Sequence, residues 1–286
     1  MKELLVISGK GGTGKTSFVG SFAALAQDKV LADCDVDAAN LHLLLKPRVK
    51  ERYEFYGLDK AYIDPEKCTE CGKCLQLCRF NAISNFRVDP IGCEGCQVCY
   101  YACEEGAIEM RPNLSGYWFV SETAYGPLIH AKLGLAEENS GKLVSKVRQA
   151  ARELAERQGY AYVLVDGPPG LGCPVISSLT GVDLALIITE PSVAGLHDLE
   201  RLLGLCNHFK VPTLVCINKW DLAPEISQQV EEFCRKKRIR VAGKVPFDDS
   251  LIEASIQGEP VVIRDPESKA SKNISSVWDT VLEALA

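Results

Sequence analysis

Short apolar runs that end in polar or glycine-rich turns recur along the chain and alternate with segments of helical periodicity. Between the runs, apolar residues recur every three or four positions, as in residues 15–26 and 140–157. This alternation predicts an α/β fold, a doubly wound and mostly parallel sheet with helices on both faces. The runs with the composition of strands buried on both faces are residues 3–7, 30–32, 162–165, 184–189 and 213–217.

The pattern weakens after about Lys46 and returns after Pro112. It predicts a strand over 116–120, an irregular extended segment over 127–135, and a last helix with Val277 and Val281 on its apolar face. We therefore expect three parts along the chain. Residues 1–57 and 113–286 form one P-loop domain, and residues 58–112 form an inserted domain of α+β, ferredoxin-like architecture.

A glycine-rich turn follows the first apolar run and precedes a helical segment. The turn matches G-x-x-x-x-G-K-T, and this strand–turn–helix context disfavours a chance glycine turn. Lys15 can supply charge to the β- and γ-phosphates, and the Thr16 hydroxyl can bind Mg²⁺. Backbone N–H groups and the positive helix end complete a phosphate cradle. The expected nucleotide-binding residues here are Gly9, Lys10, Gly11, Gly12, Thr13, Gly14, Lys15, Thr16 and Ser17.

Eight of the thirteen cysteines form two identical runs that repeat with a period of 25 residues. Each run has the spacing C-x₂-C-x₂-C-x₃-C of bacterial ferredoxins, in which the fourth cysteine ligates the other cluster. Zinc is the alternative, although two such duplicated runs disfavour it. Arg79 and Glu104 replace the proline that commonly follows the fourth cysteine. One [4Fe–4S] cluster is assigned to Cys68, Cys71, Cys74 and Cys103, and the second to Cys93, Cys96, Cys99 and Cys78.

Net charge, the length of the apolar stretches and the number of cysteines limit which partners and which cellular compartment the protein can have. The net charge of −6 argues against a general nucleic-acid binder, and no apolar stretch is long enough to span a membrane. Because the chain begins directly with a strand and shows no signal peptide, we expect a reducing cytoplasm, where spaced cysteines bind metals. Between Asp59 and Arg111 there are nine Asp and Glu residues against six Lys and Arg residues. This excess favours a basic electron partner; the alternative is that the acidic surface only confers solubility.

The phosphate turn carries a second lysine, Lys10, in the sequence Lys-Gly-Gly-Thr-Gly-Lys-Thr. This sequence resembles the deviant Walker A motif of the MinD, ParA, Mrp and nitrogenase iron protein class of ATPases. The resemblance implies ATP as the nucleotide and a nucleotide-dependent homodimer, in which Lys10 reaches the partner's nucleotide and neutralises charge on the transferred phosphoryl group. The alternative is a solvated loop lysine.

Two acidic strand ends extend the resemblance. Asp33-Cys34-Asp35, followed by Asn40-Leu41, resembles switch I, which implies that Asp35 positions the attacking water and that Asp33 lies near the Mg²⁺ shell. Asp166 ends an apolar run in the manner of a Walker B strand, and the segment through Gly170 resembles switch II. By that resemblance Asp166 holds Mg²⁺ through water, and the Gly170 N–H senses the γ-phosphate. The expected catalytic residues are Lys10, Lys15, Asp35 and Asp166.

The last nucleotide contacts are expected at Asn218, Lys219, Asp221 and Pro246. Asn218 resembles the purine-contacting asparagine of the family, and Pro246 is expected to line the base pocket. Asn218-Lys219-Trp220-Asp221 also matches the guanine-binding motif N-K-x-D, so GTP stays open as an alternative to ATP. Cys173, seven residues after Asp166, is expected to be a buried thiol; a cluster-bridging role is the alternative.

These features predict an ATPase that couples nucleotide state to electron transfer through two [4Fe–4S] clusters, and hence a redox partner protein. The alternative is an ATPase that assembles or delivers a metal or iron–sulfur cofactor to a client protein. A spatial organiser of the MinD kind is disfavoured because the C-terminal helix lacks a basic amphipathic anchor, so no membrane binding is expected.

Overall fold

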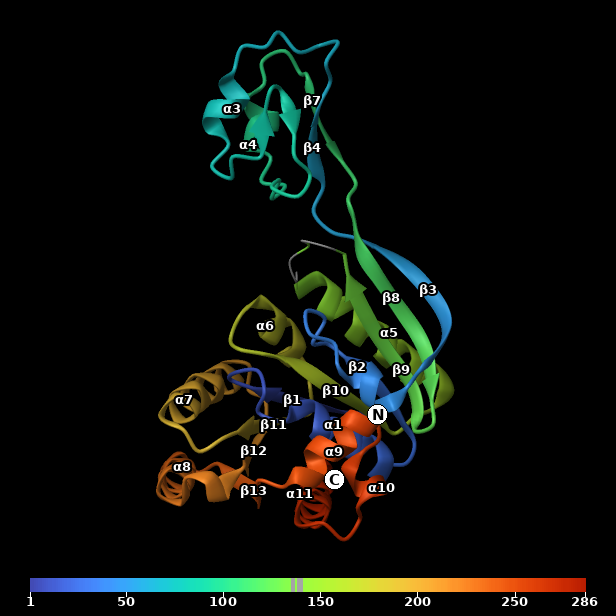
Figure 1. Cartoon of the computed structure of the whole chain (residues 1–286), viewed down its shortest axis with the longest axis vertical. Helices are drawn as coiled ribbons and strands as arrows, with labels where there is room; N and C mark the ends of the chain where they lie inside the picture. The colour runs from blue at the N-terminus through green and yellow to red at the C-terminus, as the bar shows by residue number, and fades with distance from the viewer. Residues whose placement is uncertain (135–136, 138–140) are drawn as a thin grey trace. The chain divides into compact units, whose positions relative to one another are not determined.

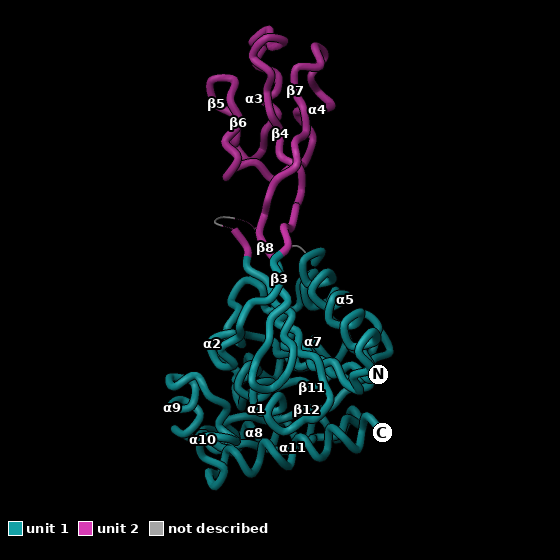
Figure 2. Tube along the Cα trace, turned by 90° about the vertical axis from the view of Figure 1, so that its right-hand side faces the viewer, with its two compact units in different colours: residues 1–52, 118–132, 139–286 teal, residues 53–117, 133–138 magenta. Residues whose placement is uncertain are grey.

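The computed structural model of the chain describes residues 1–134, 137 and 141–286. It divides into two compact units, shown in different colours in Figure 2. The first unit comprises residues 1–52, 118–132 and 139–286, and the second comprises residues 53–117 and 133–138. The chain passes from the first unit to the second within strand β3 (Arg48–Tyr56) and returns within strand β8 (Leu114–Thr123).

A mixed sheet organises the first unit, with the strand order β13-β12-β11-β1-β10-β2-β9-β8-β3 (Figure 1). Its parallel part is fully apolar at the centre, where Leu4 of β1 aligns with Leu164 of β10 on one side and Leu184 of β11 on the other. The expected mostly parallel α/β sheet is therefore confirmed. The parallel strands are β1 (Lys2–Ser8), β2 (Lys29–Asp33), β9 (Gly126–Leu133), β10 (Tyr162–Pro169), β11 (Leu184–Thr189), β12 (Thr213–Asn218) and β13 (Arg240–Val245).

Two strands differ from the sequence-based expectation. Residues 127–135 were expected to be irregular, but β9 pairs in parallel with β2, with Leu128 opposite Leu31. Pro127 is tolerated because it lies at the start of the strand, where a missing N–H costs little. Strand β3 was not expected because almost all of its residues are exposed, so no apolar alternation marks it. Leu135 lies outside the described residues.

Helices cover both faces of the sheet. Phe22 of α1 (Lys15–Leu25) packs against Trp278 of α11 (Lys269–Leu285) with ring centroids 5.0 Å apart, in the core that also contains Leu4. Leu5 points to the opposite face by strand alternation and is equally buried. The remaining helices are α2 (Leu41–Leu45), α5 (Gly141–Gln158), α6 (Cys173–Leu179), α7 (Val193–His208), the 3₁₀ turn η1 (Trp220–Leu222), α8 (Pro224–Lys237), α9 (Asp249–Gln257) and α10 (Val261–Arg264). None of the described helices is long and apolar enough to cross a membrane.

A buried ion cluster fixes α5 and α6 against the strand that leads into the phosphate turn. Glu3 is fully buried in β1, and its carboxylate pairs with Arg148 Nε and Arg152 Nε, each at 2.8 Å. Arg148 also donates to the carbonyl oxygens of Ser177 at 2.7 Å and Thr180 at 3.1 Å. Because a buried charge is tolerated only when paired, these contacts hold β1, α5 and α6 in one arrangement.

The second unit has little regular structure and a small core. Strand β4 (Lys60–Ile63) pairs antiparallel with β7 (Ile108–Arg111), and β5 (Ile83–Ser84) pairs with β6 (Arg87–Val88). Short helices α3 (Lys73–Leu77) and α4 (Val98–Ala102) lie within the two cysteine runs, and each contains the third cysteine of its run and ends just before the fourth. The few buried apolar residues pack against cysteine side chains, which therefore make up much of this core.

Candidate functional site

The glycine-rich turn leaves β1 and opens α1 in the first unit. Gly12 and Gly14 adopt φ values of 78° and 100°, which favour glycine, and Gly14 forms the N-cap of α1. A Cβ atom at Gly14 would lie 2.6 Å from Asn218 Nδ2, so glycine is also required by packing. The turn borders a cavity of about 430 Å³, whose lining includes Gly11, Gly12, Gly14, Lys15, Thr16, Ser17 and Asp35.

A carboxylate pair lies beside this cradle. The Thr16 hydroxyl donates to Asp166 Oδ2 at 2.8 Å, whereas Asp166 Oδ1 and Asp33 Oδ2 are buried and have no hydrogen-bond partner. Burial raises the pKa of Asp166 to about 7, and burial together with the Asp166 charge raises the pKa of Asp33 well above its ordinary value. Two unpartnered carboxylate oxygens and a hydroxyl are the hard oxygen ligands that Mg²⁺ prefers, directly or through water.

Lys15 and Asp35 both line the cavity and lie close to each other. Lys15 is only 5% exposed, and its ammonium nitrogen lies 3.9 Å from Asp35 Oδ2. Burial raises the pKa of Asp35, and the Lys15 charge opposes that shift. Asp37, which lies two residues further along the chain, is exposed. The structure thus places Lys15, Thr16, Asp35 and Asp166 in one small region at the carboxyl ends of adjacent strands.

Lys10 is paired within its own chain. Its ammonium group forms an ion pair with Glu190, which follows β11, and Lys219 Nζ lies 3.6 Å from the other oxygen of Glu190. Lys219 also donates to the Gly12 carbonyl at 3.0 Å. No role was predicted for Glu190 from the sequence. Its position at the carboxyl end of the strand beside β1 was the available signal.

Several residues that are expected to contact the nucleotide form hydrogen bonds within the protein. The Asn218 side-chain amide donates to the Thr13 carbonyl at 2.8 Å, and Asp221 Oδ1 accepts from the Phe247 N–H at 2.7 Å, next to Pro246. The Gly170 N–H donates to the Ser8 carbonyl at 3.0 Å. Among the residues lining the cradle, the sequence analysis had not assigned Ala38, Asn40, Leu43, Leu44, Pro169 and Ser255.

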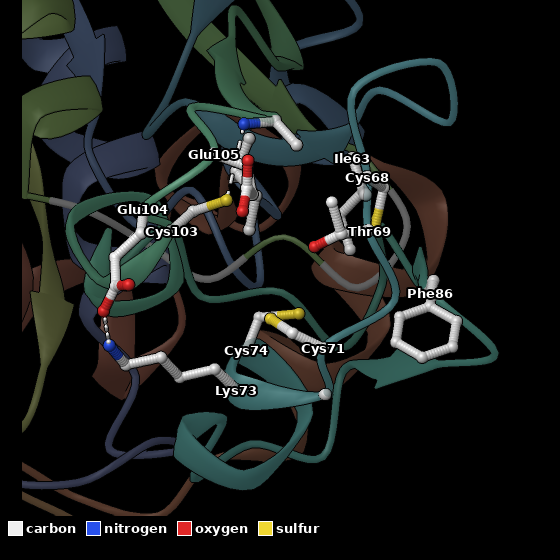
Figure 3. A pocket seen from close by; sticks show the side chains of 13 residues that line it. Ile63, Cys68, Thr69, Cys71, Lys73, Cys74, Phe86, Cys103, Glu104 and Glu105 are labelled. Atoms are coloured by element: carbon white, nitrogen blue, oxygen red, sulfur yellow. Dashed lines mark hydrogen bonds and ion pairs between the residues drawn. The ribbon is translucent and has the colours of Figure 1, made fainter.

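In the second unit, one cavity of about 250 Å³ collects four cysteines (Figure 3). Cys68, Cys71 and Cys74 come from the first run, and Cys103 is the last cysteine of the second run. The Cys103 sulfur accepts from the Ala107 N–H at 3.4 Å, as the Cys78 sulfur does from the Ala82 N–H at the same distance. The two halves of the repeat thus fold alike around their fourth cysteine.

The other run has a similar environment. Burial raises the pKa of the Cys99 thiol, and the nearby Cys93 and Cys96 add to the shift. Burial raises the pKa of the Cys74 thiol in the same way. Among the described residues, no three His, Cys, Asp or Glu side chains converge on a point that could hold a single metal ion. In the first set, the thiols surround a cavity instead.

The cysteines outside these runs differ in exposure. Cys34, Cys206, Cys216 and Cys234 are buried, as expected for structural thiols. Cys173 was expected to be buried but is exposed at the start of α6. The expectation was wrong because the apolar residues that anchor α6, such as Val175 and Leu179, lie further along that helix.

Comparison with known proteins places this geometry in context. Residues 4–261 match the model of the CobQ/CobB/MinD/ParA nucleotide binding domain. The uncharacterized protein MJ0578 of Methanocaldococcus jannaschii is 34% identical over 98% of this chain and 96% of its own length. The iron-sulfur cluster carrier protein of Aquifex aeolicus is 28% identical over 43% of this chain and 38% of its length. The septum site-determining protein MinD of Pyrococcus horikoshii, solved with Mg-ADP, aligns with a TM-score of 0.60 at 17% identity, covering 98% of this chain and 95% of that one.

Proposed function

Because the chain belongs to the CobQ/CobB/MinD/ParA nucleotide-binding family and is a P-loop ATPase of the MinD/ParA type, we propose that it couples the state of its bound nucleotide to electron transfer. In this proposal, Mg·ATP binds the first unit and two [4Fe–4S] clusters occupy a ferredoxin-like second unit, which passes electrons to a partner protein. The observation that carries the proposal is the cavity in which Cys103 lies beside Cys68, Cys71 and Cys74, in the same chain as a P-loop.

The donor chemistry of the second unit fits iron–sulfur clusters. Four thiols around one cavity suit a polynuclear cluster, because a cubane needs space between its ligands that a single ion does not. The small core also supports the assignment. A unit of this size buries a small fraction of its surface and commonly needs a metal to be stable. When bound, the clusters would supply one-electron chemistry, held by the first set at Cys68, Cys71, Cys74 and Cys103 and by the second at Cys93, Cys96, Cys99 and Cys78.

The first unit is suited to bind Mg·ATP and to direct its hydrolysis. Lys15 can exchange its distant contact with Asp35 for the β- and γ-phosphates, which leaves Asp35 free to orient an attacking water. Thr16 and Asp166 can hold Mg²⁺, since the Thr16 hydroxyl bonds one oxygen of the Asp166 carboxylate and the other oxygen has no partner. Because Lys15 and Asp166 are buried, electrostatic interactions of the phosphates with Lys15 and with the bound Mg²⁺ are stronger than they would be in water.

We further propose that Lys10 acts across a nucleotide-dependent homodimer. Its side chain is 42% exposed, so it can leave Glu190 and reach a second chain without disrupting the core. A lysine from the partner would neutralise charge that develops on the transferred phosphoryl group, as an arginine finger does. Glu190 would then remain paired with Lys219.

A second candidate function is delivery of an iron–sulfur cofactor to a client protein. It is favoured by the partial match to the iron-sulfur cluster carrier protein of Aquifex aeolicus and by the exposure of Cys71 and Cys96. Exposed ligands suit a cluster that is released, whereas a permanent electron carrier retains its clusters.

The test is a redox titration of anaerobically purified chain by EPR, without nucleotide, with Mg·ADP and with a non-hydrolysable ATP analogue. We expect about eight irons per chain and a shift of about 60 mV or more in one of the one-electron couples on ATP binding. Intact clusters whose reduction potentials do not change with nucleotide would rule out nucleotide-gated electron transfer. Transfer of iron and sulfide to an apo-ferredoxin acceptor would then favour the delivery function.

A further inference from the structure

A second cavity of about 720 Å³ lies in the second unit beside the four-cysteine cavity. Cys68, Ile63 and Phe86 line both cavities. The remaining lining of the larger one is basic, because it contains Lys60, Arg87 and Arg111 and one acidic residue, Glu70. We call these three cations and the space between them the basic groove.

The basic groove contrasts with the overall charge of the unit. Residues 59–111 contain nine acidic against six basic residues, yet three of those six line this one cavity. Lys60 pairs with Glu137 at 2.9 Å and Arg111 with Glu109 at 3.2 Å, whereas no ion pair of Arg87 is found within the described residues. The Arg111 guanidinium also lies 3.3 Å from the centre of the Tyr62 ring, which holds it at the groove wall. Carboxylates outside the lining thus partly neutralise Lys60 and Arg111, and Arg87 is the cation best placed to meet charge on a partner.

A strained turn forms the wall between the two cavities. Ser84 pairs with Arg87, so Asn85 and Phe86 make a two-residue hairpin turn with φ values of 47° and 56°. A bulky side chain such as phenylalanine rarely adopts this left-handed conformation. Figure 3 shows the Phe86 ring on the side of the pocket that carries Cys68 and Cys71, away from Glu104. The turn thus places Phe86 in the lining of both cavities and the next residue, Arg87, in the lining of the larger one.

We propose that the basic groove is the docking site of an acidic electron-carrier protein, which exchanges electrons at the Cys68 side of the unit. This inference rests on the proposed electron-transfer function and names its partner class. One electron leaves the chain and reduces the carrier by one electron. No bond forms or breaks and no proton moves. A low-potential one-electron reductant, dithionite in stoichiometric amount in the test below, replaces the electron in the clusters.

The exposure of two of the three cations favours a protein over a small anion, while the Lys60 side chain is only 15% exposed. Arg111 is 52% exposed and Arg87 is exposed, whereas small-molecule sites bury most of their ligand. Exposed charges beside a redox site act instead by steering and orienting a charged macromolecule. The net charge of residues 59–111 had predicted a basic partner. The proposal differs from that expectation, because docking depends on the charges nearest the contact.

The experiment compares Arg87→Glu with Arg79→Glu, a matched charge reversal outside the groove, where Arg79 stacks on Phe80. The probes are an acidic plant-type ferredoxin and cytochrome c, a basic carrier. Binding of each to the full-length, cluster-loaded chain is measured by calorimetry at about 0.02 M and about 0.2 M salt. The second-order rate of electron transfer to each is measured by stopped flow, after iron and EPR analysis of every variant.

We expect Arg87→Glu to weaken ferredoxin binding and slow its reduction by about tenfold at low salt, with little effect at high salt. Arg79→Glu should change both by less than about twofold. Equal effects of the two variants, or tighter binding of cytochrome c than of ferredoxin by the unaltered chain, would overturn the docking site. Competition by inorganic phosphate at the same site would also overturn it in favour of a small anion. A chain that assembles no clusters would instead reject the proposed function itself.

Discussion

Glu190 forms an ion pair with Lys10 of the phosphate turn, although 180 residues separate the two in the chain. The same carboxylate lies 3.6 Å from Lys219, which in turn donates to the Gly12 carbonyl. Glu190, which follows β11, therefore contacts both Lys10, which is expected to act in trans, and Lys219, which is expected to contact the nucleotide. In the single chain, Glu190 competes with any second chain for Lys10.

Replacing Glu190 with glutamine should make nucleotide-dependent dimerisation easier. An exposed ion pair contributes about 0.2–1 kcal/mol, so the concentration of ATP analogue needed for half-maximal dimerisation should fall by up to about fivefold. Sedimentation velocity across a nucleotide titration measures this midpoint. Glu200→Gln is the matched control, since it removes an exposed pair between Glu200 of α7 and Lys237 of α8. An unchanged midpoint in Glu190→Gln would show that the pair does not restrain Lys10.

The two lysines of the phosphate turn should separate binding from dimerisation. Lys15→Ala removes a nearly buried ammonium that faces the cavity, and a charge-assisted contact contributes about 1.5–3 kcal/mol. We therefore expect Mg·ATP affinity, measured by calorimetry, to fall by at least about tenfold. Lys10→Ala should keep the affinity of the single chain within about threefold and lose the ATP-induced dimer. Dimerisation at the normal level in Lys10→Ala would exclude action in trans.

The buried Asp166 carboxylate should make the nucleotide-free chain less stable as pH rises. Its pKa is about 7 in the folded chain and near 4 in the unfolded chain, so the folded state binds the proton more tightly. Stability is then greatest below about pH 4 and is lost as pH rises through about 7. Asp166→Asn should remove this loss and stabilise the metal-free chain at pH 8 by on the order of 1–4 kcal/mol, but much less at pH 5.

Urea denaturation in the presence of a chelator, at both pH values, measures this difference. Asp37→Asn is the control because Asp37 is a nearby but exposed carboxylate. Equal stabilisation at pH 5 and pH 8 would mean that the gain of Asp166→Asn does not come from ionisation of the carboxyl group.

Cluster ligation across the repeat can be tested by pairs of cysteine variants. If Cys103 completes the set of Cys68, Cys71 and Cys74, Cys103→Ala and Cys71→Ala should abolish the same EPR signal and lower the iron content from about eight to about four. Cys206→Ala, which removes a buried thiol of the first unit, should leave iron unchanged. Loss of the same signal in Cys103→Ala and Cys96→Ala would contradict the crossed assignment.

The sequence predicted best where function depends on local backbone geometry. The phosphate turn needs glycines at Gly12 and Gly14 because their φ values are positive, and such a requirement appears directly in the sequence. The central parallel strands were equally clear, since strands buried on both faces must be continuously apolar. Strand β3 carried no such signal because an exposed edge strand can be charged throughout.

By itself, the sequence determined the P-loop, the parallel sheet and the duplicated cysteine runs, because each is encoded in residues that are neighbours along the chain. Only the tertiary structure decided which distant groups meet: Glu190 with Lys10, Glu3 with Arg148, and Lys60, Arg87 and Arg111 around one groove. Charge and burial depend on separations in space, and the order of the strands, not the order of residues, sets those separations. For this reason the net charge predicted a basic partner, whereas the arrangement of three cations beside Cys68 supports the proposal of an acidic one.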